Sequence, residues 1–146
     1  MYTVDASVWV NAFDQQEPGH LVSRRFLDAL RNQSIPVVVP NLVLAEVAGA
    51  IGRTRRTPVE AQMFALALSR LPHVTIRLLD EACVLHAITL AAQQGLRGAD
   101  AIYAAVAQDE GSTLVTLDNE HLVRLANLLP VCTPAVALAA LPPQTE

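Results

Sequence analysis

Residues 96–118, L-R-G-A-D-A-I-Y-A-A-V-A-Q-D-E-G-S-T-L-V-T-L-D, contain one unit of the pattern from which the chain is built. Residues 99–108 are apolar apart from Asp100 and the final glutamine, which predicts a helix buried in a core. Residues 113–116, T-L-V-T, predict a short strand, and Asp118 follows it. A buried helix followed by a buried strand indicates a parallel sheet covered by helices.

The same alternation continues along the rest of the chain. Short strands are predicted at residues 2–4, 36–39, 74–78 and 129–132, and helices at residues 7–13, 18–31, 41–52, 58–70, 80–94 and 118–126. A capping box is predicted at residues 57–60, T-P-V-E. The pattern indicates a three-layer α/β/α fold with a central, mostly parallel sheet of four to five short strands. We expect one domain over residues 1–146, with a short tail from about residue 142.

Composition narrows the classes of function. The 146 residues are 52% hydrophobic but only 4% aromatic, so the core is expected to consist of aliphatic side chains and alanine. All ten basic residues are arginine, which excludes a P-loop because that motif requires a lysine. The net charge of −4 gives no overall attraction to nucleic acid.

Cysteine usage and the chain ends predict an intracellular protein without a membrane span. Cys83 and Cys132 have no metal-ligand spacing, and Asp5 precludes a signal peptide at the N-terminus. Residues 125–145 lack charge, but four prolines interrupt them, which predicts a strand, a turn and a short helix. We expect a cytoplasmic location.

Four of the fourteen acidic residues stand out from the solvated remainder. Asp5 and Asp118 each follow a strand, whereas Asp100 heads an apolar helix and Glu46 interrupts one. Ligands in parallel sheets bind beyond the carboxyl ends of the strands, where these four acids can meet. Helix capping by the three aspartates and a salt bridge for Glu46 are the alternative interpretations.

A cluster of carboxylates requires a cation. Two such charges at 4 Å repel by about 4 kcal/mol at an effective dielectric constant of 20. Oxygen ligands without histidine or cysteine suit Mg²⁺ or Mn²⁺, which hold phosphate oxygens and activate water. The cluster therefore favours metal-dependent attack on a phosphodiester.

The chain resembles PIN-domain proteins, in particular VapC-type toxin ribonucleases. The resemblance lies in the order and spacing of four short motifs: D-x-S at residues 5–7, a glutamate on the apolar helix L-V-L-A-E-V-A-G-A, L-R-x-x-D-A at residues 96–101 and V-T-x-D at residues 115–118. It implies a PIN-like fold and an endoribonuclease that is the toxin of a VapBC pair. It also implies one or two Mg²⁺ or Mn²⁺ ions per site.

The resemblance also assigns roles to individual residues. Asp5, Glu46, Asp100 and Asp118 match the acidic quartet that binds metal and is catalytic. Supporting roles fall to Ser7 and Thr116, which would orient carboxylates by hydrogen bonds, unless they are an ordinary helix cap and strand residue. Glu120 stands where many relatives carry another acid, but D-N-E departs from their D-x-D, so Glu120 is a candidate fifth ligand only.

Arginines near the predicted site are candidates for RNA or partner contacts. They are Arg53, Arg55 and Arg56 in G-R-T-R-R-T, and Arg97 beside Asp100. Solvated arginines that keep the protein soluble are the alternative.

The family implies a VapB-type antitoxin, an RNA substrate, a homodimer and no membrane. The helices at residues 41–52 and 58–70 are apolar enough to form an antitoxin groove, or else an ordinary core. A PIN nuclease in RNA processing outside toxin–antitoxin systems and an inactive PIN-fold interaction module remain the alternatives.

Overall fold

The protein contains a five-stranded parallel sheet. A computed structural model describes residues 1–142 except Arg56, and only the backbone of Arg55. The strands are β1 (Tyr2–Val4), β2 (Val37–Pro40), β3 (Val74–Arg77), β4 (Thr113–Val115) and β5 (Val131–Cys132). Their order is β3-β2-β1-β4-β5, and every neighbouring pair is parallel, which confirms the predicted sheet.

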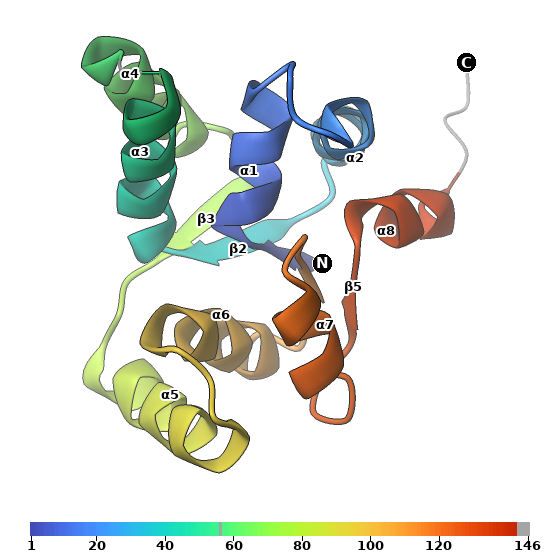
Figure 1. The fold of residues 1–146 in the computed structure, drawn as a ribbon. Coiled ribbons are helices and arrows are strands. Elements are labelled where there is room, and N and C mark those ends of the chain that lie inside the picture. The colour runs from blue at the N-terminus through green and yellow to red at the C-terminus, as the bar shows by residue number, and fades with distance from the viewer. Residues whose placement is uncertain (56, 143–146) are drawn as a thin grey trace.

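Helices cover both faces of this sheet. They are α1 (Ala6–Phe13), α2 (His20–Asn32), α3 (Leu42–Arg55), α4 (Pro58–Leu68), α5 (Glu81–Gln94), α6 (Gly98–Asp109), α7 (Asn119–Arg124) and α8 (Pro134–Ala140). Figure 1 shows α1 to α4 and α8 on one side, and α5, α6 and α7 on the other. The three-layer prediction is confirmed.

Helix α6 anchors the second layer. It contacts β1, β2 and β4, and α5 packs against its outer side. Ala101, Ala104 and Ala105 are fully buried, as is Val106, and such small side chains let a helix lie close to a sheet. Because α6 is fixed along its length, the residues at its two ends have fixed positions.

Helix ends agree with the sequence at one predicted cap and differ at another. Asp80 accepts a hydrogen bond from the Cys83 amide at 2.8 Å, and Gly95 ends α5 with a φ of 61°. The predicted capping box is wrong, because Thr57 makes no side-chain cap and its hydroxyl is buried without a partner. The ψ of 81° at Thr57 departs from the extended backbone of the capping residues Asp80 and Thr133.

The C-terminal region forms β5 and α8, as predicted, but Thr133, the extended N-cap of α8, joins them in place of the predicted turn. In the part of the chain that the structure describes, no helix combines the length and apolarity that crossing a bilayer requires. The predicted tail from residue 143 onward lies outside the described residues.

Candidate active site

Asp5 lies at the carboxyl end of β1, the central strand, and is 93% buried. Its backbone precedes α1, but its side chain makes no capping bond. Instead Oδ2 accepts hydrogen bonds from the Ser7 hydroxyl at 2.6 Å and the Thr116 hydroxyl at 2.9 Å. Two hydroxyl donors hold one oxygen of this carboxylate in a fixed direction, so capping does not explain Asp5.

Thr116 connects Asp5 to Asp118. While its hydroxyl donates to Asp5, its oxygen accepts from the Asp118 amide at 3.0 Å. Asp118 Oδ1 in turn accepts from the Glu120 amide at 2.7 Å, which caps α7. The capping interpretation of Asp118 therefore holds for one of its oxygens, and the cap fixes this carboxylate beside Thr116.

Glu46 lies on α3 and is held by a buried phenol. Tyr103 of α6, which is 1% exposed, donates from its hydroxyl to Glu46 Oε2 at 2.7 Å. Burial raises the pKa of Glu46, the Tyr103 hydrogen bond opposes this, and the negative charges of Asp5 and Asp100 raise the pKa further. No cation pairs with Glu46 within the described part of the chain, so a salt bridge does not explain it. The charges of Asp5 and Asp100 act on Glu46, so these two acids lie on the same side of the molecule as Glu46.

Asp100 contacts His121, a histidine that was not predicted as a site residue. His121 Nε2 of α7 lies 2.9 Å from Asp100 Oδ1, close enough for an ion pair, although its angle falls short of a hydrogen bond. The other ring nitrogen, Nδ1, lies 3.4 Å from the Thr116 hydroxyl. His121 is only 2% exposed. It therefore connects Asp100, through Thr116, to Asp5.

The four carboxylates share a pattern. Each has one oxygen in contact with protein, while its second oxygen makes no hydrogen bond or ion pair with any described residue. Among the described residues, no three His, Cys, Asp or Glu side chains already stand at metal-binding distances. The open oxygens are nonetheless the hard ligands that Mg²⁺ and Mn²⁺ prefer, and a cation would relieve the repulsion that raises the pKa of Glu46. The donor set fits such an ion.

Comparison with known protein families identifies the family of the chain. The model of the PIN domain family matches residues 2–128, which include all four carboxylates. The chain belongs to the PIN domain family. No curated protein matches it in a sequence comparison.

Solved structures share the fold of this PIN domain at low sequence identity. The toxin VapC20 of Mycobacterium tuberculosis, described as cleaving the sarcin–ricin loop, is 18% identical over 88% of this chain and 96% of its own, with a TM-score of 0.72. FitAcB of Neisseria gonorrhoeae is 21% identical over 92% and 98%, with a TM-score of 0.67. VapBC2 of Rickettsia felis, solved with a promoter DNA fragment, is 19% identical over 90% and 97%, with a TM-score of 0.66.

The remaining predicted site residues of the PIN domain lie outside the group of four carboxylates. Glu120 is exposed, and its carboxylate lies 3.9 Å from Arg124. Arg97 is exposed at the start of α6, and Arg53 lines a cavity that Glu46 and Ser7 also line. The Arg55 side chain and Arg56 lie outside the described residues.

Tyr103 and His121 are the two site residues that sequence reasoning missed. Tyr103 could have been found because it lies in an alanine-rich helix, and a buried tyrosine hydroxyl needs a hydrogen-bond partner. The indication for His121 is weaker: it lies four residues before the buried Leu125 and so on the inner face of α7.

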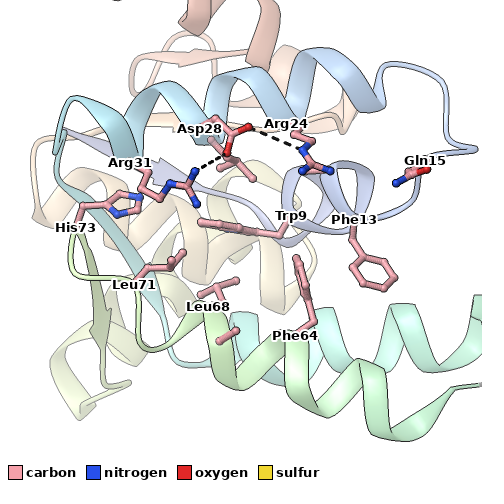
Figure 2. A pocket seen from close by; sticks show the side chains of 13 residues that line it. Trp9, Phe13, Gln15, Arg24, Asp28, Arg31, Phe64, Leu68, Leu71 and His73 are labelled. Carbon is pink, nitrogen blue, oxygen red and sulfur yellow. Dashed lines mark ion pairs between the residues drawn. The ribbon is translucent and has the colours of Figure 1, made fainter.

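For the helices at residues 41–52 and 58–70 we expect a groove or an ordinary core, and Val43, Val47 and Ile51 of α3 are buried in the core. An apolar cavity of about 440 Å³ lies between α1, α2 and α4. Figure 2 shows Trp9 and Phe64 on its walls, below the ion pairs that Asp28 makes with two arginines of α2.

Proposed function

We propose that the protein is a metal-dependent endoribonuclease and the toxin of a VapBC-type toxin–antitoxin pair, active in the cytoplasm. The observation that carries this proposal is the set of carboxylates around Asp5, each held at one oxygen and open at the other. The PIN domain match supports a nuclease, and the toxin structures that share the fold support the biological class.

The proposed metal ligands are Asp5, Glu46, Asp100 and Asp118. A bound Mg²⁺ or Mn²⁺ ion would polarise the scissile phosphate and activate the attacking water. The protein groups behind the ligands fix their orientation. Ser7 and Thr116 hold Asp5, and Tyr103 holds Glu46. Such supporting contacts typically change metal affinity by about 10- to 100-fold.

The inner side of the site is closed to bulk water, whereas Glu46, Asp100 and Asp118 are partly exposed. Asp5, Thr116 and His121 are each at least 93% buried, and electrostatic interactions strengthen where water is excluded. The same burial makes an unneutralised carboxylate cluster costly, which favours cation binding.

We further propose that an antitoxin helix binds the cavity between α1, α2 and α4. Trp9, Phe13 and Phe64 offer apolar contacts there, and an amphipathic helix fits an apolar groove of this kind. A Phe64→Asp variant is expected to lose antitoxin binding in a pull-down and to keep its nuclease activity. Undiminished capture by Phe64→Asp would refute this assignment.

The protein is also proposed to form a homodimer. Leu85 and Ile88 lie on one face of α5, and they are 57% and 58% exposed. Burial of such side chains against a second copy would remove apolar surface from water. A monomeric mass in light scattering at micromolar concentration would refute this proposal.

Cleavage of RNA tests the proposed activity. Purified total RNA is incubated with wild type, Asp5→Asn and Asp100→Asn, in Mg²⁺, in Mn²⁺ and in EDTA. We expect discrete cleavage by wild type with metal, and none in EDTA or with either variant. Full activity in EDTA, or in both variants, would rule out a metal-dependent nuclease.

A further inference from the structure

A second cavity adjoins the acidic site. Its volume is about 500 Å³, and α1, α3 and the loop after β4 form its walls. Glu46 and Ser7 lie at the end shared with the carboxylate cluster, and Arg53 lines the cavity from α3. A chain that reaches the carboxylates can therefore continue into this space.

Arg53 is the one cation among the described residues that line the cavity. Arg24, Arg31, Arg77 and Arg124 each pair with a carboxylate, whereas Arg53 has no such partner in the described part of the chain. A guanidinium without a protein carboxylate keeps its donors available to a phosphate.

The guanidinium of Arg53 is folded back along α3 toward Glu46. A Cβ added at Gly49 would lie 3.2 Å from Arg53 Nη1, so the guanidinium occupies the space over this glycine. Gly49 and Glu46 are three residues apart, or about 4.5 Å along a helix axis. This places the positive charge about one helical turn from the proposed metal ligand, which suits the phosphate that neighbours the one being cleaved.

The rest of the lining suits the sugar or base between two phosphates. Val10, Ala50 and Leu117 give an apolar wall, and Leu117 is 38% exposed. Asn11 lines the cavity as well, and its buried Oδ1 has no hydrogen-bond partner. Glu17 adds a negative charge to the lining, so a phosphate is expected at Arg53 rather than beside Glu17.

We infer that this cavity is a nucleotide subsite of the nuclease. Arg53 binds the phosphate adjacent to the scissile one, and the apolar wall contacts the intervening nucleoside. The inference rests on the proposed function, and it specifies the direction in which the RNA strand leaves the metal site. Arg53 thereby becomes a substrate-positioning residue.

Binding of a fluorescein-labelled hexauridylate in EDTA tests the subsite without turnover. The compared proteins are wild type, Arg53→Gln and Arg70→Gln, because Arg70 is likewise exposed but lines neither cavity. We expect Arg53→Gln to weaken binding about tenfold at low salt. The slope of log K against log salt should fall by about 0.7, the value of one phosphate contact on a single strand. Arg70→Gln should match wild type in both quantities.

Gly49→Ala supplies a variant that retains Arg53 but pushes its guanidinium outward by a few tenths of an ångström. Alanine favours the helix, so loss of folding cannot account for an effect. We expect weaker binding than wild type and stronger binding than Arg53→Gln. Equal binding by wild type, Arg53→Gln and Gly49→Ala, or no binding by wild type, would overturn the subsite.

The outcome is separable from that of the proposed function. Metal-dependent cleavage together with unchanged binding by Arg53→Gln would refute the subsite alone. Binding that depends on Arg53 without any metal-dependent cleavage would refute the nuclease and keep the nucleotide site.

Discussion

Helix α6 carries an aspartate with a histidine partner at each end, and the two pairs differ. At the C-terminal end Asp109 has both oxygens engaged, Oδ2 with Arg77 and Oδ1 with His86, each at 2.8 Å. At the N-terminal end Asp100 has one oxygen beside His121, while its other oxygen makes no hydrogen bond or ion pair with a described residue. A carboxylate with both oxygens satisfied serves the fold, and one left half open near other acids can bind a ligand.

The helix dipole contributes to this difference. A negative charge is favoured near a helix N-terminus and disfavoured near a C-terminus. Asp109 therefore needs its cationic partner, which joins β3 to α6, while Asp100 tolerates neighbouring acids. Equal substitutions at the two ends of α6 should therefore have different effects.

Replacing the two aspartates by asparagine should give the largest contrast. Asp100→Asn removes a proposed metal ligand and is expected to reduce metal-dependent RNA cleavage by more than about 100-fold. Asp109→Asn should keep cleavage near wild type and lower the melting temperature instead. Rates and melting curves of both proteins check this, and similar cleavage rates for the two variants would contradict it.

Replacing the two histidines by glutamine should give the next largest effect. His121→Gln removes the group that contacts Asp100, so we expect Mn²⁺ affinity in calorimetry to fall about 10- to 100-fold. His86→Gln provides the matched control and should bind Mn²⁺ like wild type. If His121→Gln keeps its Mn²⁺ affinity, His121 does not support the metal site.

Tyr103→Phe should change the pH dependence of cleavage. The Tyr103 hydrogen bond lowers the pKa of Glu46, which burial and two neighbouring acids raise. Wild-type activity should therefore fall as the pH drops through the raised pKa, and Tyr103→Phe should move this acidic limb to higher pH. The pH–rate profiles of both proteins measure it, and an unmoved or downward-shifted limb would contradict the role of Tyr103.

Glu46→Gln should change stability in the direction opposite to its effect on activity. A carboxyl with a raised pKa stabilises the fold below its ordinary pKa and loses this contribution as the pH rises through the raised value. Glu46→Gln should therefore melt above wild type near pH 7, with the difference shrinking toward pH 4. A variant that melts below wild type at pH 7 would show that the repulsion is absent.

The smallest effect is expected at the satisfied end of the helix. Arg77→Gln breaks the ion pairs with Asp109 and Glu110, which are partly exposed. The free energy of unfolding should drop by about 1 kcal/mol, with cleavage unchanged. Urea titration measures it, and reduced cleavage by the folded variant would contradict the separation of the two ends.

The sequence predicted the fold well, because alternating short strands and apolar helices leave few other arrangements. It also placed the four carboxylates at one edge of the sheet, because the ends of parallel strands share that edge. The negative charges of Asp5 and Asp100 act on Glu46, and the role of the four acids as metal ligands stays a prediction.

The site residues that the sequence did not predict make contacts with residues far away in the chain. The approach of His121 to Asp100 and of Tyr103 to Glu46 follows from how α7, α6 and α3 pack, which one sequence does not reveal. The two helices at residues 41–52 and 58–70 are a similar case, because the sequence left a groove and an ordinary core open. Val43 and Val47 of α3 are buried in the core, whereas Phe64 of α4 lines the cavity beside α1 and α2.

Anomalous diffraction from a crystal soaked in Mn²⁺ locates the metal among the carboxylates. We predict a manganese peak about 2.0–2.6 Å from the open oxygens of Asp5, Glu46 or Asp100, the range of hard-cation bonds. The satisfied pair at Asp109 should show no peak. A peak at Asp109 and Glu110 with none at Asp100 would contradict the assignment of the open carboxylates to metal binding.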